Sequence, residues 1–413
     1  MEIVELVVNS NRFKSAVSQY AVSLVCYLKE QNLSVQFSAP QESPSLPTVP
    51  LTQGEIWPCP WVVKRPIDVV KIFMFIYQWL FLHRSRQKII YVFEGREHFY
   101  FAFSKILFPW LWRKGCLVRI KGQSRVVKNH FLNRLIWIKL TEKIVFASQK
   151  NVQQCKVEIP EHKKCVSYYT HTPAPATAEV TAKLAELISE KSLLDACLRL
   201  LGVENFFLVV ARFDPVKGFD VLIPAYLRYL KLIAERNLLP LSLMVVGRKE
   251  QFGLGEFQKW FSAEKSFSLS RFDQGWVIFD RSVVSVPLVV ILDCKDFLVG
   301  PFLKGARATL IPSLDSETIC RVFLESLQLG TPCVVSSVGA LPEIASMVGS
   351  PVVDAAGGVD SWAKALVDFQ EWPPSRYQHL KEESRELGRK WSIERYDSMR
   401  NHVVSWFSDL KCH

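Results

Sequence analysis

The feature that most constrains the fold is a repeated alternation of short apolar runs with longer stretches of helical pattern. The runs are rich in Val, Ile, Leu and Phe, and they form two sets. The first set lies at residues 2–8, 33–37, 89–93, 116–120 and 143–147. The second lies at residues 206–211, 241–246, 288–292, 308–312, 333–336 and 351–354. Because continuous apolar strands separated by helices are typical of parallel sheets covered on both faces, the sequence predicts an α/β protein with two doubly wound, Rossmann-like domains.

The segment between the two sets indicates where the domains join. It reads YYTHTPAPAT at residues 168–177, where prolines disfavour a helix and small residues suit an exposed connector. The predicted organisation is a first domain at 1–170, a hinge at 171–178, a second domain at 179–375 that starts with a helix, and a terminal helix at 376–413. The terminal helix has one apolar face, so we expect it to pack on one domain or across both.

Positive charge is concentrated in the first domain. Residues 1–165 contain 24 Lys and Arg against 11 Asp and Glu, a balance of +13, whereas the rest of the chain holds 27 against 29. Between residues 101 and 150, eleven basic residues accompany a single acid, Glu142. Such a surface attracts phosphorylated substrates, anionic lipids or nucleic acids. No nucleic-acid-binding motif accompanies the charge, so we expect no nucleic acid partner.

Two apolar, aromatic segments of this domain are flanked by cations. They read VVKIFMFIYQWLFL at residues 69–82 and FAFSKILFPWLWRKG at residues 101–115. Neither reaches the ~20 apolar residues that a membrane-spanning helix requires. Each is either a core helix or an interfacial helix, whose rings lie at the lipid headgroups while Lys and Arg meet anionic phosphates. Their coincidence with the basic domain favours an anionic membrane surface as a partner.

The cysteines and the N-terminus indicate the compartment. The ten cysteines show no CxxC pair or metal-ligand spacing, and most lie in apolar runs, as expected of reduced core residues. The first residues, MEIVELVV, carry acids where a signal peptide needs bases. We expect a cytoplasmic protein without a metal site, peripheral on the inner face of the cytoplasmic membrane.

A candidate anion site follows the strand FFLVVA. The next residues, RFDPVKG at 212–218, place Arg212 and Lys217 on one strand-to-helix turn. Two cations five residues apart can point at one anion, and the N-terminus of the following helix adds partial positive charge. A guanidinium fork and an ammonium group together suit a diphosphate. The alternative is a solvated basic turn.

A second strand-to-helix unit carries two acids. From Ala308 the chain reads ATLIPSLDSETICRVFLESLQLGTPCVVSSVGALPEIA, which predicts a strand, a loop and a helix that opens near Glu317. Glu317 and Glu325 lie eight residues apart, so they would project from nearly the same side of that helix and accept hydrogen bonds from sugar hydroxyls. The first-turn backbone N–H groups, which could hold a phosphate, belong to Thr318, Ile319, Cys320 and Arg321. The two units together indicate a pocket for a nucleotide sugar.

These segments resemble a known family. PSLDSETICRVFLESLQLGTPCVVSSVGALPE is similar to the E-x7-E region of retaining GT-B glycosyltransferases of family 4, of the type that builds lipopolysaccharide and other surface glycans. ARFDPVKGFDVLIPAYLRYL resembles that family's strand and Arg–Lys-Gly segment, LSLMVVGRKE its next strand, and KWSIERYDSM its C-terminal crossover helix. The resemblance covers about residues 205–405. It implies the GT-B fold, in which two Rossmann-like domains face each other across a cleft and the C-terminal helix crosses over.

The resemblance implies roles for the matching residues. Arg212 and Lys217 would neutralise the donor diphosphate, which is electrostatic catalysis of the leaving group. Glu317 would orient the donor sugar, and Glu325 would hold the ribose. The implied reaction is transfer from a nucleotide-diphosphate sugar with retention at the anomeric carbon, and it needs neither a metal nor another cofactor.

Other positions either match the family or depart from it. Gly247 ends the matching next strand at the donor site, and the main chain of Leu292 and Asp293 lies where the family receives the nucleobase. Cys320 stands where the family usually has Gly, so it could alter donor choice or impair activity. The usual Gly-Gly loop after the first strand is replaced by residues 9–15, which lack glycine, and residues 261–285 form an insertion between two strands.

The first domain holds candidates for binding the acceptor. Glu94 follows IIYVF at the carboxyl end of a strand, the usual position of site residues in such sheets. Another strand end carries three bases, where relatives that build phosphorylated surface glycans are often basic: Arg119, Lys121 and Arg125. These bases are either a solvated loop or a contact for an anionic acceptor. His98 and His171 are weaker candidates, because His98 lies at a predicted helix start and His171 in the hinge.

The sequence therefore predicts an enzyme. We expect a retaining, metal-independent hexosyl- or glycosyltransferase that moves a sugar from a nucleotide sugar to a lipid-linked or phosphorylated glycan or glycolipid acceptor at the membrane surface. The alternative is a catalytically impaired, membrane-associated scaffold that keeps the GT-B fold, which Cys320 and the missing glycines motivate.

Overall fold

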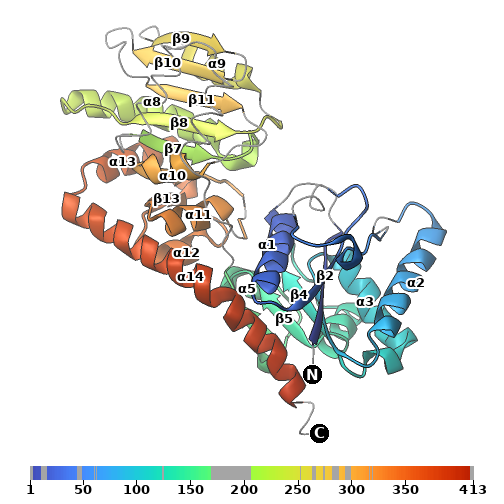
Figure 1. Cartoon of the computed structure of the whole chain (residues 1–413). Helices are drawn as coiled ribbons and strands as arrows, with labels where there is room; N and C mark the ends of the chain where they lie inside the picture. Colours follow the sequence, from blue (N-terminus) through green and yellow to red (C-terminus); the bar gives the residue numbers. More distant parts are fainter. Residues whose placement is uncertain are drawn as a thin grey trace. The chain divides into compact units, whose positions relative to one another are not determined.

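The chain folds into two compact units, each built on one sheet with helices around it (Figure 1). One unit comprises Met1–His171 and Trp391–His413, and the other comprises Thr172–Lys390. The computed structural model describes residues 3–10, 16–43, 49–59, 61, 63–122, 125–168, 206–251, 253–262, 267–272, 275–280, 288–293, 299–315, 317–318 and 320–409. The hinge at 171–178 with His171, and the helix expected after it, lie outside the described residues.

The sheet of the first unit has six parallel strands in the order β2-β1-β3-β4-β5-β6. Leu6 of β1 lies beside Gln36 of β2 on one side and Ile90 of β3 on the other. The strands are β1 (Ile3–Val8), β2 (Ser34–Ser38), β3 (Gln87–Val92), β4 (Gly115–Lys121), β5 (Lys143–Phe146) and β6 (Lys164–Val166). The prediction of a doubly wound sheet is confirmed here, and β6 is an edge strand that the pattern did not reveal.

Helices connect these strands, and α2 and α3 pack on one face of the sheet. Val4, Leu6 and Val8, which alternate along β1, join one buried cluster with Trp79 of α2 and Phe101 of α3. This alternation places every second residue of β1 against the helices. The helical segments are α1 (Ala16–Glu30), η2 (Gln53–Glu55), α2 (Pro66–Leu82), α3 (Gly95–Leu107), η3 (Pro109–Trp112), α4 (Phe131–Arg134), the π-helix η4 (Leu135–Lys139), α5 (Gln149–Gln153) and η5 (Glu161–Lys163).

The intervening residue of β1, Glu5, carries a buried carboxylate that anchors the end of the chain. It accepts hydrogen bonds from Tyr91 of β3 at 2.8 Å and from Arg400 at 3.0 Å. Burial raises the pKa of Glu5, and the guanidinium of Arg400 opposes that rise. Arg400 lies on the last helix, α14 (Pro374–Asp409), whose residues up to Lys390 belong to the second unit and whose residues from Trp391 belong to the first.

The sheet of the second unit has eight strands in the order β14-β13-β12-β7-β8-β11-β10-β9. All neighbours are parallel except β10, which runs antiparallel to both β11 and β9. The strands are β7 (Phe206–Val210), β8 (Ser242–Gly247), β9 (Phe267–Phe272), β10 (Gly275–Asp280), β11 (Val289–Asp293), β12 (Ala308–Ile311), β13 (Cys333–Ser336) and β14 (Val352–Val353). The predicted insertion at 261–285 thus contains two strands that extend the parallel sheet at one edge.

The helices of the second unit follow the expected alternation. They are α8 (Phe219–Glu235), α9 (Leu254–Ser262), α10 (Gly300–Gly305), α11 (Arg321–Leu329), α12 (Leu341–Ser346), α13 (Gly358–Gln370) and the first part of α14, with the short turns η6 (Pro215–Lys217) and η7 (Ala355–Gly357). None of the helices in the described part of the chain is long and apolar enough to cross a bilayer.

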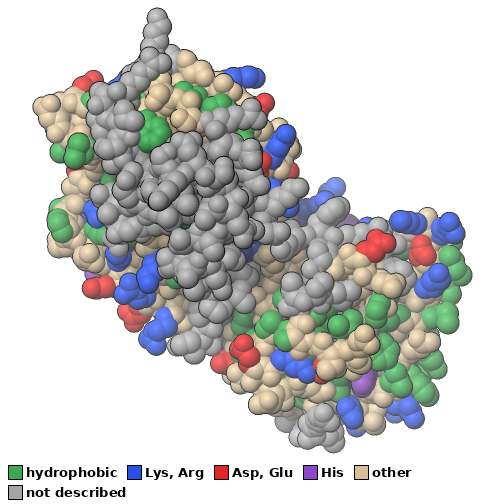
Figure 2. Space-filling view, turned by 45° about the horizontal axis from the view of Figure 1, so that its top comes forward, with side chains coloured by type: hydrophobic (Ala, Val, Ile, Leu, Met, Phe, Trp, Pro, Cys, Tyr) green, Lys and Arg blue, Asp and Glu red, His purple; other side chains and the backbone are tan. Residues whose placement is uncertain are grey.

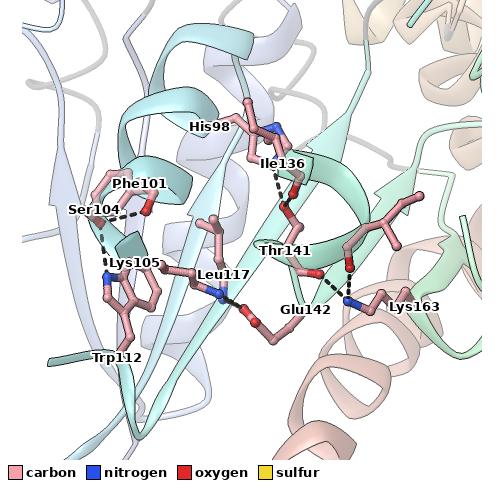
Figure 3. A network of polar contacts seen from close by, with 11 residues as sticks. His98, Phe101, Ser104, Lys105, Trp112, Leu117, Ile136, Thr141, Glu142 and Lys163 are labelled. Carbon is pink, nitrogen blue, oxygen red and sulfur yellow. Dashed lines mark hydrogen bonds and ion pairs between the residues drawn. The ribbon is translucent and has the colours of Figure 1, made fainter. Parts of the chain in front are cut away.

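His98 belongs to a buried polar network of the first unit (Figure 3). Its Nε2 lies 2.7 Å from Oγ1 of Thr141, which donates its own proton to the carbonyl of Ile136. Lys163 donates to the carbonyl of Thr141 at 2.8 Å. Because the hydroxyl proton of Thr141 is already committed, His98 must donate to it. Burial lowers the pKa of His98 well below its usual value, with Arg119 and Lys105 adding to the effect. His98 is therefore a neutral structural residue.

Glu142, the only acid between residues 101 and 150, holds the other side of this network (Figure 3). Its carboxylate forms an ion pair with Lys105 and accepts a hydrogen bond from the backbone N–H of Leu117 at 2.8 Å. Both charged side chains are largely buried. Glu142 thus ties α3 to the start of β5 and to β4, which fixes the central strands of the basic domain.

Replacing His98 with glutamine should weaken the acid sensitivity of folding. The folded state keeps His98 neutral while the unfolded chain binds a proton below pH ~6.5, so stability present above that pH is lost as pH falls, by up to ~1.4 kcal/mol per pH unit. Glutamine can still donate to Thr141 but cannot titrate. Urea unfolding near neutral pH and near pH 5 measures the difference. Burial also lowers the pKa of His83 and of His402, so part of the pH dependence of stability should remain in the variant. A pH dependence equal to that of the wild type would contradict the assignment of His98 as a buried neutral residue.

Candidate functional site

The strand order of the second sheet places a candidate site at the carboxyl ends of β7 and β12. The chain leaves β7 toward β8 on one side, and β12 later pairs with β7 on the other. Such a reversal of strand order opens a crevice at the carboxyl edge, where ligands of doubly wound sheets bind. The loop after β7 carries Arg212 and Lys217, and the loop after β12 carries Glu317. The topology therefore brings the sequence-predicted residues to one place.

Gly218 allows these two loops to touch. It follows η6 with a left-handed backbone, φ 74° and ψ 26°, and a Cβ there would lie 2.0 Å from the carbonyl oxygen of Pro312. Next to this contact, the backbone N–H of Leu314 donates to the carbonyl of Val216 at 2.9 Å. Any side chain at position 218 would push the loops apart, so this glycine sets the distance between Lys217 and Glu317.

Lys217 and Glu317 form an ion pair between the two loops. Their side chains are only 21 % and 15 % exposed, and Oγ of Ser313 donates to Oε1 of Glu317 at 2.9 Å. Burial alone lowers the pKa of Lys217, but the carboxylate of Glu317 more than compensates, so the pKa of Lys217 is raised. The amine is thus held charged beside a carboxylate that already has two donors.

The backbone of Glu317 is fixed by a third loop, which follows β13. The N–H of Ala340 donates to the carbonyl of Glu317 at 2.7 Å, and a Cβ on Gly339 would lie 2.1 Å from that same oxygen. The prediction that a helix opens near Glu317 is therefore wrong, because this carbonyl is taken by another loop. The helix α11 begins at Arg321, and Glu317 lies in the preceding loop, so Glu317 and Glu325 do not share a helix face.

The N-terminus of α11 lies next in the chain. Of the four residues expected in its first turn, only Arg321 is helical; Cys320 caps the helix, Thr318 precedes it, and Ile319 lies outside the described residues. Cys320 is buried, and desolvation raises the pKa of its thiol to about 12, with Glu317 adding to the rise. The cysteine is therefore a neutral side chain at the helix start.

Glu325 is buried one turn into α11 and paired with Arg321. Nε and Nη2 of Arg321 donate to Oε1 of Glu325 at 2.9 and 2.8 Å. Burial raises the pKa of Glu325, and the guanidinium opposes that rise. Both hydrogen bonds end on one oxygen, so the pair orients the carboxylate while Oε2 keeps its acceptor capacity.

Arg212 is half-exposed and pairs with a carboxylate that the sequence did not single out. It forms an ion pair with Glu250, which also binds Arg248 at 3.2 Å. Oδ2 of Asp214 lies 3.9 Å from Nη1 of Arg212. Oδ1 of Asp214 accepts a hydrogen bond from the backbone N–H of Val216 and so caps η6. The only signal for Glu250 in the sequence is its place three residues after the end of β8, at the same sheet edge.

The three remaining donor-site candidates lie at strand ends of the same sheet. Gly247 ends β8 and lies against the carbonyl of Ala211, beside Arg212. Leu292 is buried within β11. Asp293 ends β11 and accepts a hydrogen bond from the backbone N–H of Lys249 at 2.8 Å. Gly247 thus lies on β8, which pairs with β7, and Leu292 and Asp293 lie on β11, which pairs with the other side of β8.

The first sheet has its own reversal point, between β1 and β3, and a buried carboxylate occupies it. Glu97 is fully buried in the first turn of α3, and it accepts hydrogen bonds from the backbone N–H groups of Ser10 at 2.7 Å and Phe93 at 2.9 Å. Desolvation raises the pKa of Glu97 to about 8 despite these bonds. Sequence reasoning missed Glu97. The available signal was its position three residues after Glu94, at the start of the helix that follows β3.

Arg119 and Lys121 lie at the carboxyl end of β4, which Lys121 ends, so the alternative of a solvated loop is wrong for both. They lie within β4 between β3 and β5, and they are only 2 % and 3 % exposed. Burial lowers the pKa of Arg119 to about 10, against the pull of Glu97 and Glu94, and that of Lys121 to about 8. Nη1 of Arg119 donates to the carbonyl of Val92 at 3.3 Å.

The other two acceptor candidates lie outside this strand. Glu94 is partly buried at the cap position of α3, directly after β3 and Phe93, as the sequence predicted. Arg125 is exposed in the loop after β4. Arg119 and Glu94 both act electrostatically on Glu97, so these three side chains lie near one another at the edge of the first sheet. No group of His, Cys, Asp and Glu among the described residues could hold a metal ion.

Two Rossmann-like α/β units in one chain define the GT-B class of fold. Residues 204–371 match the family model described as glycosyl transferases group 1, which is less than half of the chain. This match contains both the loop of Arg212 and Lys217 and the loop of Glu317.

Solved structures share the fold along the whole chain. HepE from Anabaena, in complex with UDP and glucose, is 13 % identical with a TM-score of 0.60, over 99 % of this chain and 100 % of that one. A glycosyltransferase from Rickettsia africae is 13 % identical with a TM-score of 0.64, over 99 % and 98 %. Sucrose-phosphate synthase from Thermosynechococcus elongatus is 13 % identical with a TM-score of 0.63, over the full length of both chains. No curated protein matches the chain.

Proposed function

We propose that this protein is a glycosyltransferase that uses a nucleotide-diphosphate sugar as donor. The observation that carries the proposal is the Lys217–Glu317 pair at the reversal point of the second sheet, next to Arg212 and the N-terminus of α11. Cations and helix amides there suit a diphosphate, and a carboxylate beside them suits sugar hydroxyls. The family match over this segment, and a neighbour of the same fold solved with UDP-glucose, support the same donor class.

The proposed chemistry is displacement of the diphosphate with retention at the anomeric carbon. As the bond between that carbon and the phosphate oxygen breaks, its electron pair goes to the diphosphate, where Arg212 and Lys217 stabilise the charge in place of a metal. The acceptor hydroxyl attacks from the same side and passes its proton to the leaving oxygen. Cys320 does not serve as a nucleophile, since its thiol stays protonated at neutral pH. Oε2 of Glu325 would accept a ribose hydroxyl.

The proposed acceptor is a lipid-linked or phosphorylated glycan, bound at the carboxyl edge of the first sheet. Arg119 and Lys121 would supply positive charge, and Glu94 would accept hydrogen bonds from hydroxyls. The balance of +13 on residues 1–165 favours an anionic acceptor presented on the inner face of the cytoplasmic membrane. The acceptor assignment rests on residues of the first unit and the donor proposal on residues of the second, so the two can be tested separately.

A thermal-shift screen of sugar nucleotides tests the donor proposal. A nucleotide sugar present at about 100 times its Kd should stabilise the folded protein by about 2.7 kcal/mol, and we expect one base and one sugar to give the largest rise. Slow hydrolysis of that donor without acceptor should follow. A GT-B scaffold without catalysis, which Cys320 at the start of α11 would favour, predicts no hydrolysis of any sugar nucleotide. The absence of both stabilisation and hydrolysis would refute the proposal.

A further inference from the structure

The solvent-facing side of α2 is largely apolar, which is unusual for a surface helix. Along it, apolar residues recur at alternating spacings of three and four, so they form one stripe. Their exposed fractions lie between 38 % and 54 %. The stripe consists of Ile67, Val70, Met74, Tyr77 and Phe81. The opposite side of α2 is buried in the core through residues such as Ile76 and Trp79. Lys71 and Gln78 are also exposed on α2, but most of its exposed side chains are apolar, so the helix lacks the continuous polar face by which surface helices meet water.

The stripe continues onto the segment after α3 through a chain of aromatic rings. The ring of Tyr77 meets that of Phe108 edge-on at 5.2 Å, and Phe108 meets Trp110 in the same way at 6.1 Å. Trp110, at 57 % exposed, is the outermost ring of this chain. We call the five stripe residues together with Trp110 the apolar face. Because its parts touch, it is one continuous surface and not a scatter of single exposed side chains.

Cations border the apolar face at both ends of α2. Lys64 and Arg65 precede the helix, and Arg84 and Arg86 follow it; all four are exposed. The guanidinium of Arg84 lies 4.3 Å from the centre of the Phe81 ring, so charge and apolar surface adjoin directly. Figure 2 shows the corresponding side of the first unit, where hydrophobic side chains gather with Lys and Arg beside them.

The arrangement matches the chemistry of a lipid surface. Apolar side chains and a tryptophan can enter the acyl boundary while flanking Lys and Arg remain at anionic phosphates. Two copies of this chain meeting through the same patch would bring the same cations together, which opposes association. The cations thus favour an anionic partner over a second copy.

We propose that the apolar face inserts into the interface of an anionic bilayer, with α2 lying in the membrane plane. The inference deepens the proposed function, since it names the surface by which the acceptor-binding unit would reach a lipid-linked acceptor. It does not depend on donor chemistry, because lipid binding needs no sugar nucleotide. Membrane attachment is therefore assigned to α2 and Trp110.

Sedimentation of the full-length protein with vesicles tests this proposal. We expect binding to phosphatidylcholine vesicles that contain phosphatidylglycerol, much weaker binding to phosphatidylcholine alone, and a decline with added salt. The double variant Val70→Glu with Met74→Glu should lower the partition coefficient by about tenfold or more, since it removes apolar contact and adds like charge to the lipid. Arg84→Gln should lower it by about fivefold at low salt.

Matched controls separate this effect from misfolding and from a protein interface. Leu239→Glu changes an apolar residue of the second unit that is 89 % exposed, and vesicle binding should not change. The double variant should keep wild-type thermal unfolding. Equal binding to neutral and anionic vesicles, or wild-type vesicle binding by the double variant, would overturn the inference. Ultracentrifugation tests the alternative of a protein interface. A wild-type dimer that becomes a monomer in the double variant, with vesicle binding unchanged, would also overturn the inference. A protein that binds vesicles but no sugar nucleotide would refute the proposed function alone.

Discussion

Replacing Glu317 with glutamine should lower sugar transfer, or donor hydrolysis in the absence of acceptor, by about 10²- to 10³-fold, the usual effect of removing one group that stabilises a transition state. Glutamine keeps the size of the side chain and an oxygen for Ser313, but it loses the charge that faces Lys217. The rate should fall through kcat more than through KM if the carboxylate acts mainly on the donor sugar as its bond breaks.

The Glu317 variant needs a check on folding, because its partner is a largely buried amine. Removing one member of a fully buried ion pair costs about 3–5 kcal/mol, and the partial exposure of both side chains places the expected cost below that range. Circular dichroism and thermal unfolding will show whether the variant is folded at the assay temperature. Asp315→Asn is the matched control, since Asp315 is an exposed acid of the same loop and its loss should change the rate less than about twofold. A folded Glu317→Gln protein with wild-type turnover would remove the basis of the assignment.

Replacing Arg212 and Lys217 together with alanine should weaken the binding of a nucleoside diphosphate by about 10²- to 10⁴-fold. Each charge-assisted hydrogen bond to phosphate contributes about 1.5–3 kcal/mol, and the double variant loses both cations. Calorimetric titration with UDP measures the change directly and needs no acceptor. The single variants should each account for part of the loss, and the salt dependence of binding should become weaker because two phosphate contacts are gone.

Glu250 offers the control for this experiment. It pairs with Arg212, so Glu250→Gln should leave UDP affinity unchanged or increase it, because the guanidinium no longer has a competing carboxylate. A loss of affinity in Glu250→Gln equal to that in Arg212→Ala would mean that the pair acts only as a structural support. An unaltered UDP affinity in the double alanine variant would contradict the role of both cations.

The strand pattern could be predicted from sequence because it depends on local composition. Apolar runs such as 333–336 and 206–211 became strands with boundaries within a residue or two, and the order of strands then placed Lys217 and Glu317 at one edge. The expected roles of the site residues stay predictions, and the variants above test them.

The errors arose where a contact from another part of the chain decided the local structure. Helical spacing placed Glu317 on α11, but the loop after β13 claims the carbonyl that a helix would need. Arg119 and Lys121 look like surface residues by type, yet β4 is a central strand and buries both. Glu97 and Glu250 escaped notice because their importance depends on partners far along the chain: Ser10 for Glu97 and Arg212 for Glu250.

The close approach of main chain to main chain at Gly218 and Gly339 has a consequence for how this site can evolve or be engineered. The three loops can approach one another because Gly218 and Gly339 have no side chain, whereas the residues available to a ligand are those whose side chains project from these loops. Substitutions at exposed loop positions such as Asp315 can therefore change the surface of the site while the frame stays intact. Lengthening a loop or adding a single methyl group at either glycine would instead dismantle the frame, so new specificities are reachable by exchange of residues and not by insertion.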